Sequence, residues 1–342
     1  MRFASKFVCL ALFAIATPIL RIAAQDLVLV HTDESKYRNA IYAESRRQLM
    51  QGEFDALEKS AEGFRKSKAS YFHGSWALTS FYLGAADIDY ETPDSECLAF
   101  LQKIKAWAAA KPYSVTARIA LAHALVDYAW KARGTGWSDS VSKSGTALMS
   151  ERLAEARKVL DEAKQLPTKC PAWWDVAQRV ALGQSWDKER YMTLFKEATT
   201  FEPSYIDFYE NAVLYLQPRW YGEEGESERF MEEQANRRMG IEGDVFYARL
   251  VWLLDWHQLD ANLFEAHPQL VWRRTVAGFN ELLRRYPDSL SAKSEFARLC
   301  FAARDKERAR LLFQQIGSNM DMRIWGDHID TFVLYRRWAL GR

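Results

Sequence analysis

Apolar side chains three and four positions apart recur along almost the whole of this 342-residue sequence. The spacing from Phe195 through Ala198 to Pro203 returns between Phe279 and Pro287. Residues at these intervals share one face of an α-helix, because each helical turn takes 3.6 residues. Signals for β-strands are scarce. The pattern therefore predicts an all-α fold, arranged as a solenoid-like array of helix hairpins.

Capping residues, prolines and glycines divide this pattern into separate helices. The expected helices cover approximately 33–50, 54–66, 72–85, 92–110, 115–132, 147–165, 172–183, 188–201, 205–216, 227–238, 244–256, 269–285, 291–304, 306–316 and 328–340. Two distinctive loops separate them, a Gly/Ser-rich stretch at 134–146 and a second segment at 217–226. The run 27–30 is the one β-branched segment with strand character. Long loops in a helical chain are often functional.

The start of the sequence predicts an export signal covering residues 1–24. Basic Arg2 and Lys6 precede an apolar run at 7–20, and small residues follow at Ala23 and Ala24. The run is short of the roughly 20 residues that span a bilayer, although an uncleaved anchor remains an alternative. We expect an exported protein, periplasmic or secreted. Residues 25–342 are expected to form a single helical-repeat domain, with halves at 33–133 and 147–340 around the loop 134–146.

Charge and cysteine content narrow the class of protein. The chain has 46 Lys and Arg against 45 Asp and Glu, and this balance argues against a nucleic-acid partner. No apolar stretch after the signal approaches membrane length. Cys97, Cys170 and Cys300 are widely spaced, which argues against zinc-finger and thioredoxin-like motifs. One disulfide with one free thiol is an option, but three buried thiols are favoured because a chain this long needs no covalent staples.

Sequence motifs for catalysis are absent: there is no H-E-x-x-H, G-x-S-x-G or G-x-x-x-x-G-K-[ST]. Asp87, Asp89 and Glu91 have the D-x-D-x-E spacing that begins a calcium loop, but Thr92 and Leu98 stand where glycine and glutamate are required. This segment is therefore interpreted as a solvated acidic turn. The sequence predicts no catalytic residue, no metal site and no cofactor.

The histidines include no pair three or four residues apart, so a metal site would need ligands from distant helices. His123 lies on an Ala/Leu-rich helix and is interpreted as a hydrogen-bonded core residue.

Aromatic residues give the strongest functional signal, with 13 Trp, 15 Tyr and 19 Phe. Most are expected to fill helix–helix contacts. Trp137 and Trp220 differ because each lies in a glycine-containing loop near an arginine, and aromatic rings with arginines are typical binding anchors. The candidate binding residues are Arg133, Gly134, Trp137, Arg219, Trp220, Tyr221 and Gly222. A structural alternative is that Trp220 fills a helix junction while Arg219 caps helical carbonyls.

The spacing at 172–203 resembles the tetratricopeptide-repeat (TPR) family, whose units are helix–turn–helix pairs of about 34 residues. Similar pieces lie at 51–57 and 290–316. The chain also resembles an exported bacterial family of unknown function, through A-W-K-A-R-G-T-G at 129–136, P-A-W-W at 171–174 and P-R-W-Y-G at 218–222. In the last segment Tyr221 replaces the first glycine of that family's P-x-W-G-G. This resemblance covers about 44–338 and implies a fold without an activity.

The leading hypothesis is a non-catalytic scaffold that binds a protein or peptide on a helical face. The alternative is a helical enzyme or binding protein that acts on glycans or cell-wall material. Its acid and base would come from Asp87, Asp89, Asp139, Glu223 and Glu224, provided that two carboxylates share a cleft. A structural module without a dedicated ligand is a second alternative. The pattern defines no oligomeric state.

Overall fold

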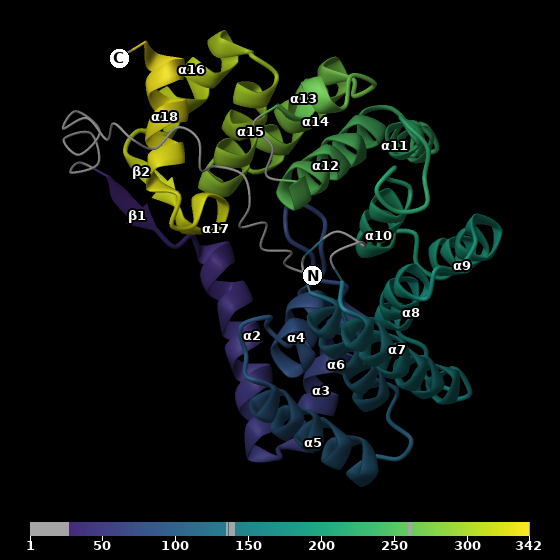
Figure 1. Ribbon diagram of the computed structural model, residues 1–342. Coiled ribbons are helices and arrows are strands. Elements are labelled where there is room, and N and C mark those ends of the chain that lie inside the picture. The colour runs from purple at the N-terminus through teal and green to yellow at the C-terminus, as the bar shows by residue number, and fades with distance from the viewer. Residues whose placement is uncertain (1–26, 135, 137–140, 259–261, 342) are drawn as a thin grey trace. The chain divides into compact units, whose positions relative to one another are not determined.

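The computed structural model describes residues 27–134, 136, 141–258 and 262–341 (Figure 1). The predicted signal at 1–24 lies outside these residues, as do Trp137 and Asp139. Helices dominate the described chain and only two three-residue strands occur in it, so the predicted all-α class is confirmed. Among the described residues, no helix combines the length and the apolar character that crossing a membrane requires.

The chain divides into two compact units, and each is described by itself. Unit 1 runs from Tyr37 to Gly222, whereas unit 2 combines residues 27–36 with the described residues between 223 and 341. These units do not coincide with the predicted halves 33–133 and 147–340. The loop 134–146 lies within unit 1, because the helices before and after it pack extensively against each other.

The helices of unit 1 follow one another with short connections. They are α2 (Asp33–Gln51), which begins in unit 2, α3 (Phe54–Ser67), α4 (Ala77–Ala86), α5 (Asp94–Ala110), α6 (Val115–Arg133), α7 (Lys143–Lys164), α8 (Pro171–Gly183), α9 (Lys188–Phe201) and α10 (Asp207–Tyr215). Helix α6 packs on α4, α5, α7 and α8, and α8 in turn packs on α9 and α10. Helix α4 therefore contacts α6, α6 contacts α8, and α8 contacts α10. Large aromatic side chains fill the interior, including Phe81, Trp107, Trp130, Tyr191, Phe208 and Tyr215.

Unit 2 joins both ends of the described chain. Its helices are α11 (Glu226–Asn236), α12 (Ile241–Gln258), α13 (Leu263–Ala266), α14 (Trp272–Arg285), α15 (Leu290–Ala302), α16 (Lys306–Ile316), α17 (Met322–Trp325) and α18 (Ile329–Leu340). Helices α12 and α14 pack closely, as do α15 and α16. Strand β1 (Val28–Val30), within the run predicted at 27–30, pairs in parallel with β2 (Asn319–Asp321), so that Val28 lies opposite Asn319.

The helix expected at 72–85 begins five residues later than its sequence suggested. The range 72–85 is helical only from Ala77, because residues 70–76 form a turn closed by an antiparallel bridge between Ser70 and Trp76. Gly74 supplies the positive φ of +97° that this turn requires. The preference for three buried thiols is confirmed, since Cys97, Cys170 and Cys300 are all free and buried.

Candidate functional site

Helix α6 carries a stripe of polar and aromatic side chains through an otherwise apolar interior. The helix starts after Ser114, whose hydroxyl accepts a hydrogen bond from the Ala117 amide at 2.9 Å. His123, Asp127 and Trp130 follow at intervals of four and three residues, so they lie along one face. All three are buried. Buried polar groups require partners; His123 and Asp127 pair with each other on α6, and Asp127 has further partners from neighbouring elements.

Asp127 is the centre of these contacts. The Arg179 guanidinium, from α8, is hydrogen-bonded and ion-paired to Oδ1 of Asp127. The Ile88 amide donates to Oδ2 at 3.4 Å, and His123 Nε2 lies 3.3 Å from the same oxygen. Burial alone would raise the pKa of the Asp127 carboxyl, but Arg179 and His123 together hold that pKa well below its usual range. Asp127 is therefore a fixed anion with defined partners on both oxygens.

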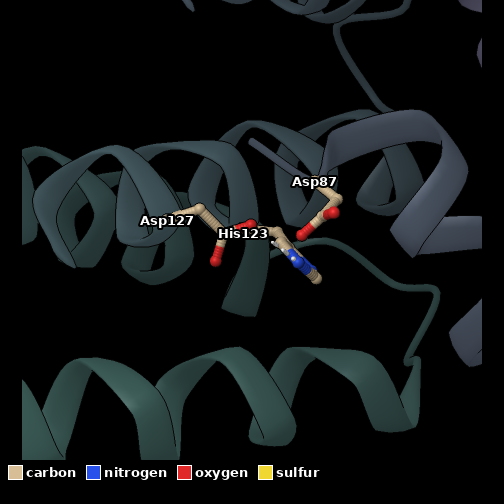
Figure 2. A group of neighbouring side chains, drawn as sticks. All are labelled: Asp87, His123 and Asp127. Atoms are coloured by element: carbon tan, nitrogen blue, oxygen red, sulfur yellow. Dashed lines mark ion pairs between the residues drawn. The ribbon is translucent and has the colours of Figure 1, made fainter. Parts of the chain in front are cut away.

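Asp87 brings a second carboxylate to the same place. It follows the last residue of α4 and is half-buried. One oxygen of Asp87, one oxygen of Asp127 and a ring nitrogen of His123 all lie within 4.8 Å of one another (Figure 2). Burial and the like charge of Asp127 raise the pKa of Asp87, against the smaller opposing effects of His123 and Arg179. Neighbouring carboxylates thus have pKa values shifted in opposite directions, a pattern that occurs at functional sites.

The segment after Asp87 runs along α6 toward its C-terminal end. The Tyr90 hydroxyl donates to the Trp130 carbonyl at 2.5 Å and lies 3.3 Å from the Gly134 carbonyl. Burial raises the pKa of Tyr90 to about 12, so the hydroxyl remains a hydrogen-bond donor at neutral pH. Gly134 ends the helix with a φ of +82°, which favours glycine. These contacts connect the Asp87 region to the end of α6.

Two of the sequence-predicted residues meet at that end. The Arg133 guanidinium lies 5.7 Å from the centre of the Trp130 ring and 5.8 Å from the centre of the Trp220 ring. The two indoles pack edge to face with centroids 5.5 Å apart. Arg133 also donates to the Gly136 carbonyl at 3.0 Å. The structure therefore brings the C-terminal end of α6 together with the second predicted loop, although Arg133 and Trp220 are almost 90 positions apart in the sequence.

The remaining candidates from the second loop are packed to different degrees. Arg219 is exposed, whereas the Trp220 side chain is half-buried and its Nε1 is buried without a hydrogen-bond partner. The Tyr221 hydroxyl donates to Ser185 Oγ at 2.7 Å, and its ring lies against Tyr215. Gly222 approaches the backbone closely: a Cβ there would lie 1.9 Å from the Leu216 carbonyl oxygen. Trp137, the other predicted anchor, is outside the described residues.

Most of the acids proposed for an enzyme do not gather in one place. Asp89 is exposed and accepts a hydrogen bond from the Glu91 amide at 3.0 Å. Glu223 and Glu224 are exposed and belong to unit 2, while Asp139 lies outside the described residues. Among the described residues of this set, Asp87 is the one grouped with another carboxylate and a histidine.

Sequence reasoning missed Asp127 and Arg179. The intervals from His123 through Asp127 and Trp130 to Arg133 give a readable signal, because they define one helical face. Arg179 and Asp87 carry no such signal, because their approach to α6 depends on how α8 and α4 pack against it. His123 is buried as expected, beside a hydrogen-bonding partner one turn away on the same helix.

Part of this site lies in a segment that is similar to a known domain model. Residues 42–173 match a domain of unknown function (DUF4034). The matched segment is less than half of the chain and contains Asp87, His123, Asp127 and Arg133, whereas Arg179 lies beyond it. Neither the curated proteins nor the solved structures gave a match.

Proposed function

We propose that this protein is a non-catalytic binding module, whose unit 1 holds a peptide segment of a protein partner. The convergence of Arg133 and Trp220 on Trp130 carries the proposal. Arginine and tryptophan are enriched among the residues that dominate binding energy, because they combine apolar area with directed polar contacts. Exposed Arg219, next to Trp220 in the sequence, provides a positive charge suited to an acidic or aromatic segment.

The helix packing of unit 1 supports a repeat-like binding surface. Each of α4, α6, α8 and α10 contacts the next in this series, as the first helices of TPR units do in a stacked array. We propose that unit 1 is TPR-like in this sense and that this series of helices faces the ligand. The partner is a protein or peptide rather than a nucleic acid, given the balanced charge of the chain.

We propose export as the setting of this binding. The basic start, the apolar run 7–20 and the small residues at Ala23 and Ala24 support a cleaved signal and a periplasmic or secreted protein. Purification of the protein from its native source tests this directly: a mature N-terminus near Gln25 in an extracytoplasmic fraction is expected. A full-length chain in the cytosolic fraction would contradict export.

Selection from a phage-displayed library of random peptides tests the binding function. The variant Arg219→Glu reverses an exposed charge beside Trp220, and Lys103→Glu on α5 is the matched control because Lys103 is also exposed in unit 1. We expect enriched peptides that contain acidic and aromatic residues and that bind wild type and Lys103→Glu alike. Arg219→Glu should weaken binding about tenfold or more, which corresponds to about 1.4 kcal/mol. No enrichment, or equal binding to all three proteins, would refute the proposal and favour a structural module.

The opposed pKa shifts of Asp87 and Asp127 favour a second candidate, an enzyme or binding protein for glycans or cell-wall material. Glycosidases use a protonated acid beside an ionised carboxylate, about 5 Å apart in retaining enzymes. Asp127 is buried and paired with Arg179, so Asp87 would be the residue that exchanges a proton with substrate. Incubation of purified peptidoglycan with wild type and Asp87→Asn tests this. Soluble fragments released by wild type alone would support catalysis, and none from either protein would argue against it.

A further inference from the structure

The donor atoms of Asp87, His123 and Asp127 form a compact set at the junction of two elements. The ligand atoms of His123 and Asp127 come from α6, one helical turn apart, and that of Asp87 comes from the residue that follows α4. His123 lies between the two aspartates in Figure 2, and the three ligand atoms are all within 4.8 Å of one another. His123 and Asp127 are each only 6% exposed, so both are held in place by the surrounding helix packing.

The separation of the two ligand atoms on α6 matches the coordination geometry of a small divalent ion. With metal–ligand bonds of about 2.1 Å, neighbouring ligand atoms lie roughly 3.0–3.5 Å apart around one ion. His123 Nε2 and Asp127 Oδ2 are 3.3 Å apart, which is within that range. The arrangement therefore fits two ligands of a shared ion without a change in the backbone of α6.

Asp127 has a direct ion pair, whereas Asp87 has none among the described residues. Arg179 pairs with Asp127 through Oδ1, and Oδ2 of Asp127 faces His123. Among the described residues, no side chain donates a hydrogen bond to the Asp87 carboxylate or forms an ion pair with it. A half-buried carboxylate next to a second carboxylate is costly unless it binds a proton or a cation.

We propose that Asp87, His123 and Asp127 bind one divalent transition-metal ion, with Zn²⁺ as the best-matched ion. An imidazole nitrogen with two carboxylates suits zinc and its neighbours, whereas Ca²⁺ and Mg²⁺ favour sets composed entirely of oxygen. Arg179 has the role of a positioning residue, because its contact with Oδ1 orients Asp127 so that Oδ2 faces the site. Of the calcium-loop spacing in the sequence, this site uses Asp87 alone, since Asp89 is exposed and takes no part. It does not depend on the proposed binding function.

Calorimetric titration of the chelator-treated full chain with ZnCl₂ tests this proposal. Asp87→Asn removes one ligand charge at a half-buried position, and Asp89→Asn is the matched control two residues away. We expect one ion per wild-type chain at this site, the same result for Asp89→Asn, and binding weakened at least tenfold in Asp87→Asn. Thermal melts should show that zinc raises the Tm of wild type and Asp89→Asn more than that of Asp87→Asn.

A second readout separates this site from zinc bound by surface histidines. Co²⁺ bound by one nitrogen and two carboxylate oxygens gives visible absorption bands, and these should be lost in Asp87→Asn and in His123→Gln. Far-ultraviolet circular dichroism establishes that each variant is folded. The proposal is wrong if wild type binds no zinc. It is also wrong if folded Asp87→Asn binds zinc as tightly as wild type, because the three residues would then form only a proton-sharing network.

Discussion

Asp207 offers a direct test of how burial controls a charge in unit 1. This residue begins α10 and is buried. The Thr79 hydroxyl donates to Oδ2 of Asp207 at 2.6 Å, and the Ser75 hydroxyl donates to Oδ1 at 3.4 Å. Burial, followed by the like charges of Asp175 and Glu210, raises the pKa of Asp207 to about 7, while hydrogen bonds from Thr79 and Tyr205 oppose the rise.

The sign of the effect on stability follows from the two states. In the unfolded chain the Asp207 carboxyl has its ordinary pKa of 3.8, whereas in the folded protein the pKa is about 7. Between these values the folded protein holds a proton that the unfolded chain has released. The proton bound by Asp207 therefore stabilises the folded protein in full below the unfolded pKa of 3.8. This stabilisation is lost as the pH rises through the folded pKa of about 7. The full difference between the two pKa values of Asp207 corresponds to about 4 kcal/mol of free energy of unfolding. Because the titration of Asp207 is coupled to that of its neighbour Asp175, the expected change in the free energy of unfolding is about 2–4 kcal/mol.

The variant Asp207→Asn removes this titration while it keeps the size and hydrogen-bonding capacity of the protonated acid. Urea unfolding of wild type and variant, followed by tryptophan fluorescence, gives the free energy of unfolding between about pH 4 and about pH 8. We expect the variant to gain about 2–4 kcal/mol relative to wild type across this interval. Asp89→Asn, an exposed control, should keep a constant offset. A difference between Asp207→Asn and wild type that does not change with pH would refute the reasoning.

Three substitutions test other contacts in unit 1, each through the free energy of unfolding in urea. Arg179→Met leaves buried Asp127 without its cationic partner and should cost about 3–5 kcal/mol; a loss below about 1 kcal/mol would show that the ion pair is dispensable. Gly222→Ala places a Cβ against the Leu216 carbonyl and should lower the free energy of unfolding by about 1–3 kcal/mol. Gly63→Ala, in open space within α3, should instead stabilise by about 0.5–1 kcal/mol, so equal effects at both glycines would contradict the packing argument.

The sequence predicted helix ends best where local chemistry determines them. The ranges 188–201 and 306–316 agree with α9 and α16, because Asp187 and Asp305 each cap a helix with the side chain. The range 72–85 began too early because its aromatic content is equally compatible with a buried turn. That turn depends on the bridge between Ser70 and Trp76, which no helical spacing reveals.

The candidate site was predictable only where it follows a single helix. The intervals of three and four residues predict one shared helical face for His123, Asp127, Trp130 and Arg133. The contact between Trp130 and Trp220 joins segments that the sequence keeps far apart, so loop composition could select Trp220 but could not identify its neighbour. The pairing of Arg179 with Asp127 depends on two helices that pack through largely apolar faces, and nothing local to either residue predicts it.

The parallel pairing of β1 with β2 imposes an order on biosynthesis. Unit 1 is one continuous segment, so all of its residues have been made once Gly222 leaves the ribosome. Strand β1 precedes it in the chain, yet its partner begins only at Asn319. Until β2 has been synthesised, the backbone hydrogen-bond donors and acceptors of Val28 and Leu29 therefore lack the strand with which they pair in the folded protein. An unsatisfied strand edge of this kind can recruit another nascent chain, so pairing with β2 is the step that removes this hazard.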